Sequence, residues 1–343
     1  NQGGTVTDNT LTVGAQTLSG SMDLRAESGI NPLAPTSVWD VGTTANFDNT
    51  SALTLNNQII AGSTTTLTAG AGTGDIILNN PANSLRNVTV NSGRDVTLTS
   101  AYNGGVTIGL PQTAGGLRNV TIDYASAPSV ALYGNGAYFS PYYWDYGERP
   151  QPAQLSGNLA VTSGGTIDHG NYSWLNLTGA SSTSTFNSAG DITLNRGENN
   201  LGAVTVNPTL ATVSANLYNN SSNADLTLSS PITNLTLAQP NVSFTLLDNK
   251  VTGSLYLNNQ GGTVTDNTLT VGAQTLNGTM AMYSDDTISQ TGAWSTGGTI
   301  TLTTPKPFTL GYNITTANGG ITFPTAVMLV GDATVDTGRS PGG

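Results

Sequence analysis

The sequence contains no cysteine, a single histidine and few charged residues. Without cysteine the chain has no disulfides, which a protein of this size does not need if its core is large. Charged residues make up only 8 % of the 343 residues, against roughly 25 % in an average soluble domain. Lysine occurs twice and glutamate three times. Because both residues normally cover exposed helix faces, their scarcity argues against helices.

Most of the charges that are present are negative, and the formal net charge is −11. Such a chain repels phosphate and carries no basic patch, so we expect no nucleic-acid partner and no binding to anionic membranes. No apolar run of about 18 residues occurs, so we expect no membrane insertion. No signal peptide opens the sequence, because residues 1–4 already lie inside a repeat. We therefore expect the chain to be a segment of a longer polypeptide.

Internal repeats dominate what the sequence does contain. Residues 1–18, NQGGTVTDNTLTVGAQTL, recur unchanged as residues 259–276. Residues 74–91 return in altered form as residues 190–207. A chain that repeats itself over such distances is built by stacking similar units.

Between the repeats, short stretches rich in Thr, Val, Ile and Leu alternate with turn residues. Patterns such as Thr-x-Thr and Val-x-Val point one side chain inward and the next outward, as in a β-strand. Asn recurs at the ends of these stretches, where its amide can bond to the backbone or to an Asn stacked above it. We expect Val, Ile and Leu at matching inward positions to form apolar columns.

Comparable strands recur about every 20 to 35 residues, the length of one supersecondary unit in a repeat protein. This spacing predicts an all-β fold, a parallel β-solenoid in which residues 1–343 form a single continuous segment. At roughly 20 to 30 residues per coil, the segment would hold about 12 to 17 coils. A string of antiparallel β-sandwich domains is the alternative. The absence of a domain-sized linker favours the solenoid.

The strand pattern is interrupted once, at residues 133–152, YGNGAYFSPYYWDYGERPQP. Prolines cannot join a central ladder, so this stretch is predicted to be an extruded loop or hairpin. Its aromatic side chains are our candidates for ligand binding or adhesion, through stacking on sugar rings or anchoring a protein partner. The alternative is that they fold back and cover one side of the coil. The candidate residues are Tyr138, Phe139, Tyr142, Tyr143, Trp144 and Tyr146.

The repeat motif, G-D-I-x-L-N-x(3)-N-x-L-x(2)-V-T-V-N, occupies residues 74–91 and 190–207. It resembles the repeats of filamentous haemagglutinin-like exoproteins of two-partner secretion systems. The resemblance implies a right-handed parallel β-helix on a bacterial cell surface, exported through an outer-membrane transporter and acting as adhesin, biofilm component or stalk. The secretion motif of that family, Asn-Pro-Asn-Leu, is not present, because Asn31-Pro32-Leu33 lacks the second Asn.

Few residues offer catalytic or metal-binding chemistry. His169 is the only histidine, and Asp168 beside it in sequence is poorly placed to orient its ring for a catalytic triad, so a turn residue is the simpler interpretation. With one His and no Cys, a His-based metal site lacks partners. Residues 72–75, Gly-Thr-Gly-Asp, superficially resemble a calcium-binding repeat. Because the pattern is not iterated, we interpret Asp75 as a turn residue.

The remaining acidic residues suggest two further alternatives. The adjacent Asp285 and Asp286 are expected to form an exposed, solvated pair. Polysaccharide-cleaving β-helices use clustered carboxylates, and Asp145 and Glu148 could form such a pair within the aromatic stretch. No second acidic cluster with nearby Lys or Arg accompanies them. Ice binding through Thr-x-Thr faces would need regular coils, and the coil lengths here vary too much.

These observations predict a non-enzymatic segment with no catalytic residues, no metal and no cofactor. We expect a rigid spacer of an extracellular, cell-surface exoprotein whose partners are glycans or proteins of a host or neighbouring cell. Two alternatives stay open: a polysaccharide-binding or polysaccharide-cleaving β-helix, and a filament subunit that assembles with further copies of itself.

Overall fold

The computed structural model describes residues 9–112, 117–134, 152–169, 173–222, 225–263, 266–324 and 326–338. Within these ranges every regular element is a β-strand, and the strand pairs are parallel. The chain is a β-solenoid of about 14 turns, which confirms the predicted fold class. It divides into two compact units, Asn1–Gly190 and Asp191–Gly343. That the two units form one continuous segment stays a prediction.

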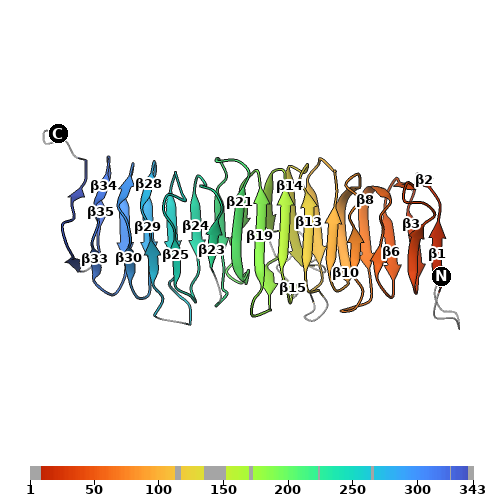
Figure 1. Ribbon diagram of the computed structural model, residues 1–343, viewed down its shortest axis with the longest axis horizontal. Coiled ribbons are helices and arrows are strands. Elements are labelled where there is room, and N and C mark those ends of the chain that lie inside the picture. The colour runs from red at the N-terminus through yellow and green to blue at the C-terminus, as the bar shows by residue number, and fades with distance from the viewer. Residues whose placement is uncertain are drawn as a thin grey trace, which may run out of the picture. The chain divides into compact units, whose positions relative to one another are not determined.

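The described residues of the first unit, which is drawn from red to green in Figure 1, form 19 strands. They are β1 (Thr10–Val13), β2 (Gln16–Leu18), β3 (Met22–Ala26), β4 (Gly29–Pro32), β5 (Val38–Val41), β6 (Ala45–Asn49), β7 (Leu53–Thr54), β8 (Gln58–Thr68), β9 (Ile76–Leu78), β10 (Ser84–Ser92), β11 (Val96–Thr99), β12 (Val106–Leu110), β13 (Val120–Tyr124), β14 (Ser129–Gly134), β15 (Ala153–Leu155), β16 (Leu159–Ser163), β17 (Thr166–His169), β18 (Leu175–Leu177) and β19 (Thr183–Ser188).

In the second unit, which is drawn from green to blue, the described residues form 18 strands. They are β20 (Ile192–Leu194), β21 (Ala203–Pro208), β22 (Ala215–Tyr218), β23 (Leu226–Leu228), β24 (Leu235–Ala238), β25 (Phe244–Leu246), β26 (Leu255–Asn258), β27 (Leu269–Val271), β28 (Gln274–Leu276), β29 (Met280–Tyr283), β30 (Ile288–Gln290), β31 (Trp294–Thr296), β32 (Ile300–Thr303), β33 (Phe308–Leu310), β34 (Ile314–Thr316), β35 (Ile321–Thr322), β36 (Val327–Leu329) and β37 (Val335–Asp336).

Each strand pairs with the equivalent strand of the next turn, which we call the next rung. In the first unit, β7, β9, β11, β13, β16 and β19 follow one another across one sheet. In the second unit, β20, β22, β24, β26, β29, β32 and β35 do the same. Parallel pairing of strands that are one turn apart excludes the antiparallel sandwich alternative, because sandwiches join antiparallel neighbours.

The pairing register stacks like side chains into the predicted apolar columns. In the second unit two columns run side by side along the inner face of one sheet, and the members named here are all buried. Burying each large apolar side chain stabilises the fold by about 1.5–3 kcal/mol. The first column is Ile192, Ala215, Leu235, Leu255, Met280 and Ile300, and the second is Leu194, Leu217, Leu237, Leu257, Met282 and Leu302.

A polar column accompanies the apolar ones inside the second unit. At the end of β22, β24 and β26 the next residue is Asn219, Gln239 or Asn259, and each is fully buried. The backbone N–H of Asn219 donates to the carbonyl of Ala238 at 2.8 Å, so these positions stack directly. The prediction that Asn lies at the corners is confirmed here, but these side chains point inward.

Turn length varies within the first unit. Asn119 and Asp95, at equivalent places on consecutive rungs, are 24 residues apart, whereas Asn158 and Asn119 are 39 apart. The longer turn contains the stretch predicted to be extruded. A solenoid accommodates such an insertion because each rung contacts only its neighbours.

No helix of the length and hydrophobicity that a membrane span requires occurs in the described part of the chain.

Candidate functional site

The six aromatic candidates, Tyr138, Phe139, Tyr142, Tyr143, Trp144 and Tyr146, lie outside the described residues. The structure does show where their segment leaves and rejoins the solenoid. β14 ends at Gly134, whose N–H donates to Ser173 Oγ at 3.3 Å. β15 begins at Ala153, whose N–H donates to the carbonyl of Trp174 at 2.9 Å. Both ends of the segment are therefore attached to the first unit.

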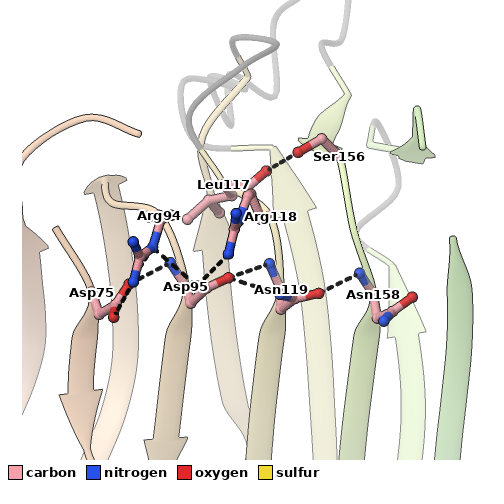
Figure 2. Close-up of polar contacts among 8 residues, drawn as sticks. All are labelled: Asp75, Arg94, Asp95, Leu117, Arg118, Asn119, Ser156 and Asn158. Carbon is pink, nitrogen blue, oxygen red and sulfur yellow. Dashed lines mark hydrogen bonds and ion pairs between the residues drawn. The ribbon is translucent and has the colours of Figure 1, made fainter. Parts of the chain in front are cut away.

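A line of polar side chains crosses the rungs on either side of this segment (Figure 2). We call it the corner ladder and define it as Asp75, Arg94, Asp95, Arg118, Asn119 and Asn158. Asp75, Asp95, Asn119 and Asn158 each stand one residue before a strand of the same sheet, namely β9, β11, β13 and β16. The repeated rung places these four side chains one above another.

Each of these side chains accepts a hydrogen bond from the next rung. The N–H of Asn119 donates to Asp95 Oδ1 at 3.1 Å, and the N–H of Asn158 donates to Asn119 Oδ1 at 3.0 Å. The N–H of Thr183 donates to Asn158 Oδ1, also at 3.0 Å. A backbone N–H at the start of a strand would otherwise lack a partner, so the ladder satisfies it. Only Asn, Asp and similar short side chains reach this donor.

Two arginines add charge to the ladder. Arg94 Nη2 lies 2.6 Å from Asp75 Oδ2, and its Nε lies 3.1 Å from Asp95 Oδ2. Arg118 Nη2 lies 3.3 Å from the same oxygen of Asp95. Burial opposes ionisation of Asp95, but hydrogen bonds from Asn119 and Arg118 outweigh it and lower the pKa of Asp95. Because the guanidinium groups are exposed to solvent, these ion pairs hold the rungs together only weakly.

The ladder also ties together the rungs that the aromatic segment separates. Ser156, just after β15, donates through its N–H and its Oγ to the carbonyl of Leu117, at 3.0 and 3.2 Å. Leu117 and Arg118 precede the segment, and Ser156 and Asn158 follow it (Figure 2). The base of the inserted segment is therefore held by hydrogen bonds on both sides.

The structure gives Asp75 a partner that the sequence analysis did not foresee. Both carboxylate oxygens accept hydrogen bonds from Arg94, at 2.8 and 2.6 Å. This contact supports the turn-residue interpretation over the calcium alternative. Over the described ranges, no cluster of three or more His, Cys, Asp or Glu residues could hold a metal ion.

His169 and Asp168 both lie in strand β17, so the interpretation of His169 as a turn residue is wrong. Their register partners on β14 are Leu132 and Ala131, neither of which can act in catalysis. Burial raises the pKa of Asp168. The pairing of β17 with β14 thus brings no catalytic group beside either residue.

The expectation for Asp285 and Asp286 is wrong in part. Asp286 is only 9 % exposed, and it forms an ion pair with Lys306. The hydrogen bond from Lys306 is the main reason that the pKa of Asp286 lies below its ordinary value. Asp285 Oδ2 accepts a hydrogen bond from the N–H of Gly261 at 3.2 Å. Alternation along the chain points Asp286 inward, and the lysine comes from the following rung.

Two groups of functional interest were missed in the sequence. The Arg94 contacts carry a signal, since Arg-Asp at residues 94 and 95 follows Gly-Asp at 74 and 75 by one turn. Tyr256 and Tyr283 lie on the outer face of adjacent strands, with ring centroids 5.4 Å apart. Their signal is an aromatic residue at a position that alternates with buried Leu or Met. Without the register, the two rings could not be placed together.

Comparison with protein-family models finds a match to repeats of unknown function (DUF5649) at residues 2–59, 151–207 and 260–313, together just under half of the chain. The first and third matches include most of the identical 18-residue sequence. The second begins where the predicted insertion ends. Comparisons with curated proteins and with solved structures find no match. The chain is therefore a repeat protein with a β-solenoid fold.

Proposed function

We propose that this repeat protein is a non-enzymatic structural segment of a secreted bacterial surface exoprotein of the filamentous haemagglutinin-like kind. In this proposal it reaches the cell surface through an outer-membrane transporter. Its rungs then hold the aromatic segment at residues 138–146 away from the cell for adhesion to glycans or proteins of another cell. The repeat motif at residues 74–91 and 190–207 supports the family assignment.

The observation that carries the proposal is the unbroken register between rungs. In the second unit, inward columns keep the same position from β20 to β32, and each strand between them bonds to a neighbour on both sides. Each rung adds about 4.8 Å of length. Stability is then close to a sum of neighbour terms, so rungs can be added without changing the others. Such a structure suits a spacer.

The aromatic segment suits adhesion because its base is fixed. The corner ladder bonds the rungs that precede and follow it, and Ser156 bonds directly to Leu117. A binding segment held at both ends loses less conformational entropy when it meets a ligand. Aromatic residues also supply most of the energy at many interfaces.

A filament subunit is the second candidate, and one observation favours it. Residues 1–18 recur unchanged as residues 259–276, at a distance of 258 residues. A copy at so long a period suits an assembly in which similar units follow one another.

Adhesion assays on variants of the aromatic segment test the main proposal. The variant carries Tyr142→Ser, Tyr143→Ser and Trp144→Ser, and Tyr312→Ser serves as the control because Tyr312 is 46 % exposed elsewhere. We expect the triple variant to lose most binding to cultured epithelial cells, while the control keeps it. Unchanged binding by the triple variant would contradict adhesion through this segment. Hydrolysis of a polysaccharide that is lost on Asp145→Asn would replace the proposal with the enzyme alternative.

A further inference from the structure

One outer face of the second unit carries two adjacent tyrosines. It consists of the outward side chains of β22, β24, β26, β29 and β32, and we call it the tyrosine face. Two columns make it up, because alternate residues of each strand point outward. The first column is Asn216, Thr236, Tyr256, Ala281 and Thr301, and the second is Tyr218, Ala238, Asn258, Tyr283 and Thr303.

Two aromatic rings lie together at the centre of this face. Tyr256 and Tyr283 have centroids 5.4 Å apart and planes inclined by 41°. In the pairing of β26 with β29, Tyr256 lies opposite Ala281, which is small, and Tyr283 lies opposite Asn258. Tyr256 is 37 % exposed. The two rings therefore lie against each other, and part of the Tyr256 ring is open to solvent.

Three polar groups around these rings have no hydrogen-bond partner among the described residues. Among the described residues, neither tyrosine hydroxyl has a hydrogen-bond partner, and the Asn258 Nδ2 group has none either. Asn258 Oδ1 accepts one bond, from the N–H of Gln260 at 2.8 Å. On strands of the first unit, by comparison, some outward polar groups bond to one another across rungs. There Asn187 Nδ2 donates to Thr162 Oγ1 at 3.0 Å.

The tyrosine face also carries no charge. None of the ten side chains that define it is Asp, Glu, Lys, Arg or His, although the whole chain has a formal net charge of −11. The corresponding outer positions of β3 in the first unit hold Asp23 and Arg25. An uncharged surface of Tyr, Asn and Thr has no electrostatic attraction for ionic ligands. It does offer rigid amphipathic rings and adaptable hydrogen bonds.

From these observations we infer that the tyrosine face binds uncharged polysaccharide. The apolar faces of sugar rings lie on Tyr256 and Tyr283, and the sugar hydroxyls bond to the two phenol groups and to the Asn258 amide. The ligand class follows from the chemistry of the face: an apolar ring surface, several free donors and acceptors, and no charge.

The inference deepens the glycan-binding part of the proposed function but places it at a second site. It does not depend on the aromatic segment, which belongs to the other unit. Loss of binding at residues 142–144 would test the first site, and loss at residues 256 and 283 would test this one. The two results are therefore distinguishable.

Affinity electrophoresis of the full chain in gels containing mannan, dextran or heparin, together with sedimentation on microcrystalline cellulose and chitin, tests the inference. The variants are Tyr256→Ala, Tyr283→Ala and both together, with Tyr312→Ala as the control for loss of an exposed tyrosine. We expect retention by at least one uncharged polysaccharide and not by heparin. We expect the double variant to bind at least about tenfold more weakly than the unmodified chain, and the control to bind as well as the unmodified chain.

Three results would overturn the inference. The first is no retention by any of the uncharged polysaccharides. The second is retention by heparin alone. The third is a double variant that binds as well as the unmodified chain. Circular dichroism shows whether each variant is folded, so that a loss of binding caused by unfolding can be recognised. Because both tyrosines are on the outer face, we expect their substitution to leave the circular dichroism spectrum unchanged.

Discussion

The same nine residues, TLTVGAQTL, occur in both units, at 10–18 and at 268–276. In both places the next rung supplies a tryptophan whose indole N–H donates at 2.9 Å to a glycine carbonyl. Trp39 bonds to Gly14, and Trp294 bonds to Gly272. Yet Leu11 is partly exposed, whereas its counterpart Leu269 is fully buried.

The neighbouring strands explain this difference. β27 pairs with β25 on one side and with β30 on the other, whereas β1 pairs with β4 alone among the described strands. The sequence of a rung decides which side chains point inward, and the adjacent rungs decide how far they are buried. Stability in a solenoid is therefore a property of pairs of rungs.

The largest expected effect comes from removing a tryptophan. Trp294 is 1 % exposed and Trp39 is 0 % exposed. The ring centroid of Trp294 lies 5.8 Å from that of Phe308, and the ring centroid of Trp39 lies 5.7 Å from that of Phe47. We expect Trp294→Ala and Trp39→Ala to lower the free energy of unfolding by about 3–5 kcal/mol each. Urea denaturation followed by circular dichroism measures this. A loss confined to one of the two would show that the two sites are not equivalent.

Substitution of Leu11 and of Leu269 should affect stability to different extents in the two copies. We expect Leu269→Ala to lower the free energy of unfolding by about 2–5 kcal/mol, because it leaves a cavity between two rungs. Leu11→Ala should cost less than half as much, since its side chain is already in contact with water. Equal losses on urea denaturation would mean that burial does not follow the neighbouring rung.

The two copies also differ in the space around their shared glycine, which is Gly14 in the first copy and Gly272 in the second. A Cβ added at Gly272 would lie 2.2 Å from Asp248 Oδ1 and 2.9 Å from Asp248 N, whereas one added at Gly14 meets only Leu33 Cδ2, at 3.8 Å. We expect Gly272→Ala to destabilise the fold by about 1–3 kcal/mol through overpacking. Gly14→Ala should change stability by about 0.5 kcal/mol or less. Thermal unfolding of the two variants would contradict this if Gly14→Ala were the worse.

The smallest expected effect concerns charge. Asp286 pairs with Lys306 beside the second copy, and its pKa is lowered below the ordinary 3.8. Its contribution is therefore present above that value and is lost as the pH falls through the lowered pKa. We expect Asp286→Asn to cost about 1 kcal/mol near pH 7 and progressively less in acid. A cost that stays constant from neutral pH to about pH 2 would rule out the ion pair as its source.

Much of the fold could be predicted from alternation and spacing. Patterns such as Leu235-Thr236-Leu237 specify a strand with two inward leucines, and the repeat distance specifies a turn of the coil. The register could not be predicted, because it depends on how turns of unequal length close. That is why Arg94 was not matched to Asp75, and why Asp286 was expected to be exposed. Lys306 lies one rung away and has no sequence signal that links the two.

The candidate sites were less predictable for the same reason. A tyrosine that points outward from one strand cannot be assigned to a binding site until its neighbours across the sheet are known. Tyr256 and Tyr283 are far apart in sequence and adjacent only through the pairing of β26 with β29. The aromatic segment, by contrast, is visible in composition, but its residues lie outside the described part of the structure.

Distances between spin labels in the second unit test the stacking of rungs most directly. The chain has no cysteine, so labels attach only where cysteines are introduced. Thr193 would carry one label, and Ala281, Thr301 or Thr322 the other, all in a single outward column. We predict separations of roughly 19, 24 and 29 Å, rising by about 4.8 Å for each rung. Distances that do not rise evenly with rung number would contradict the parallel solenoid.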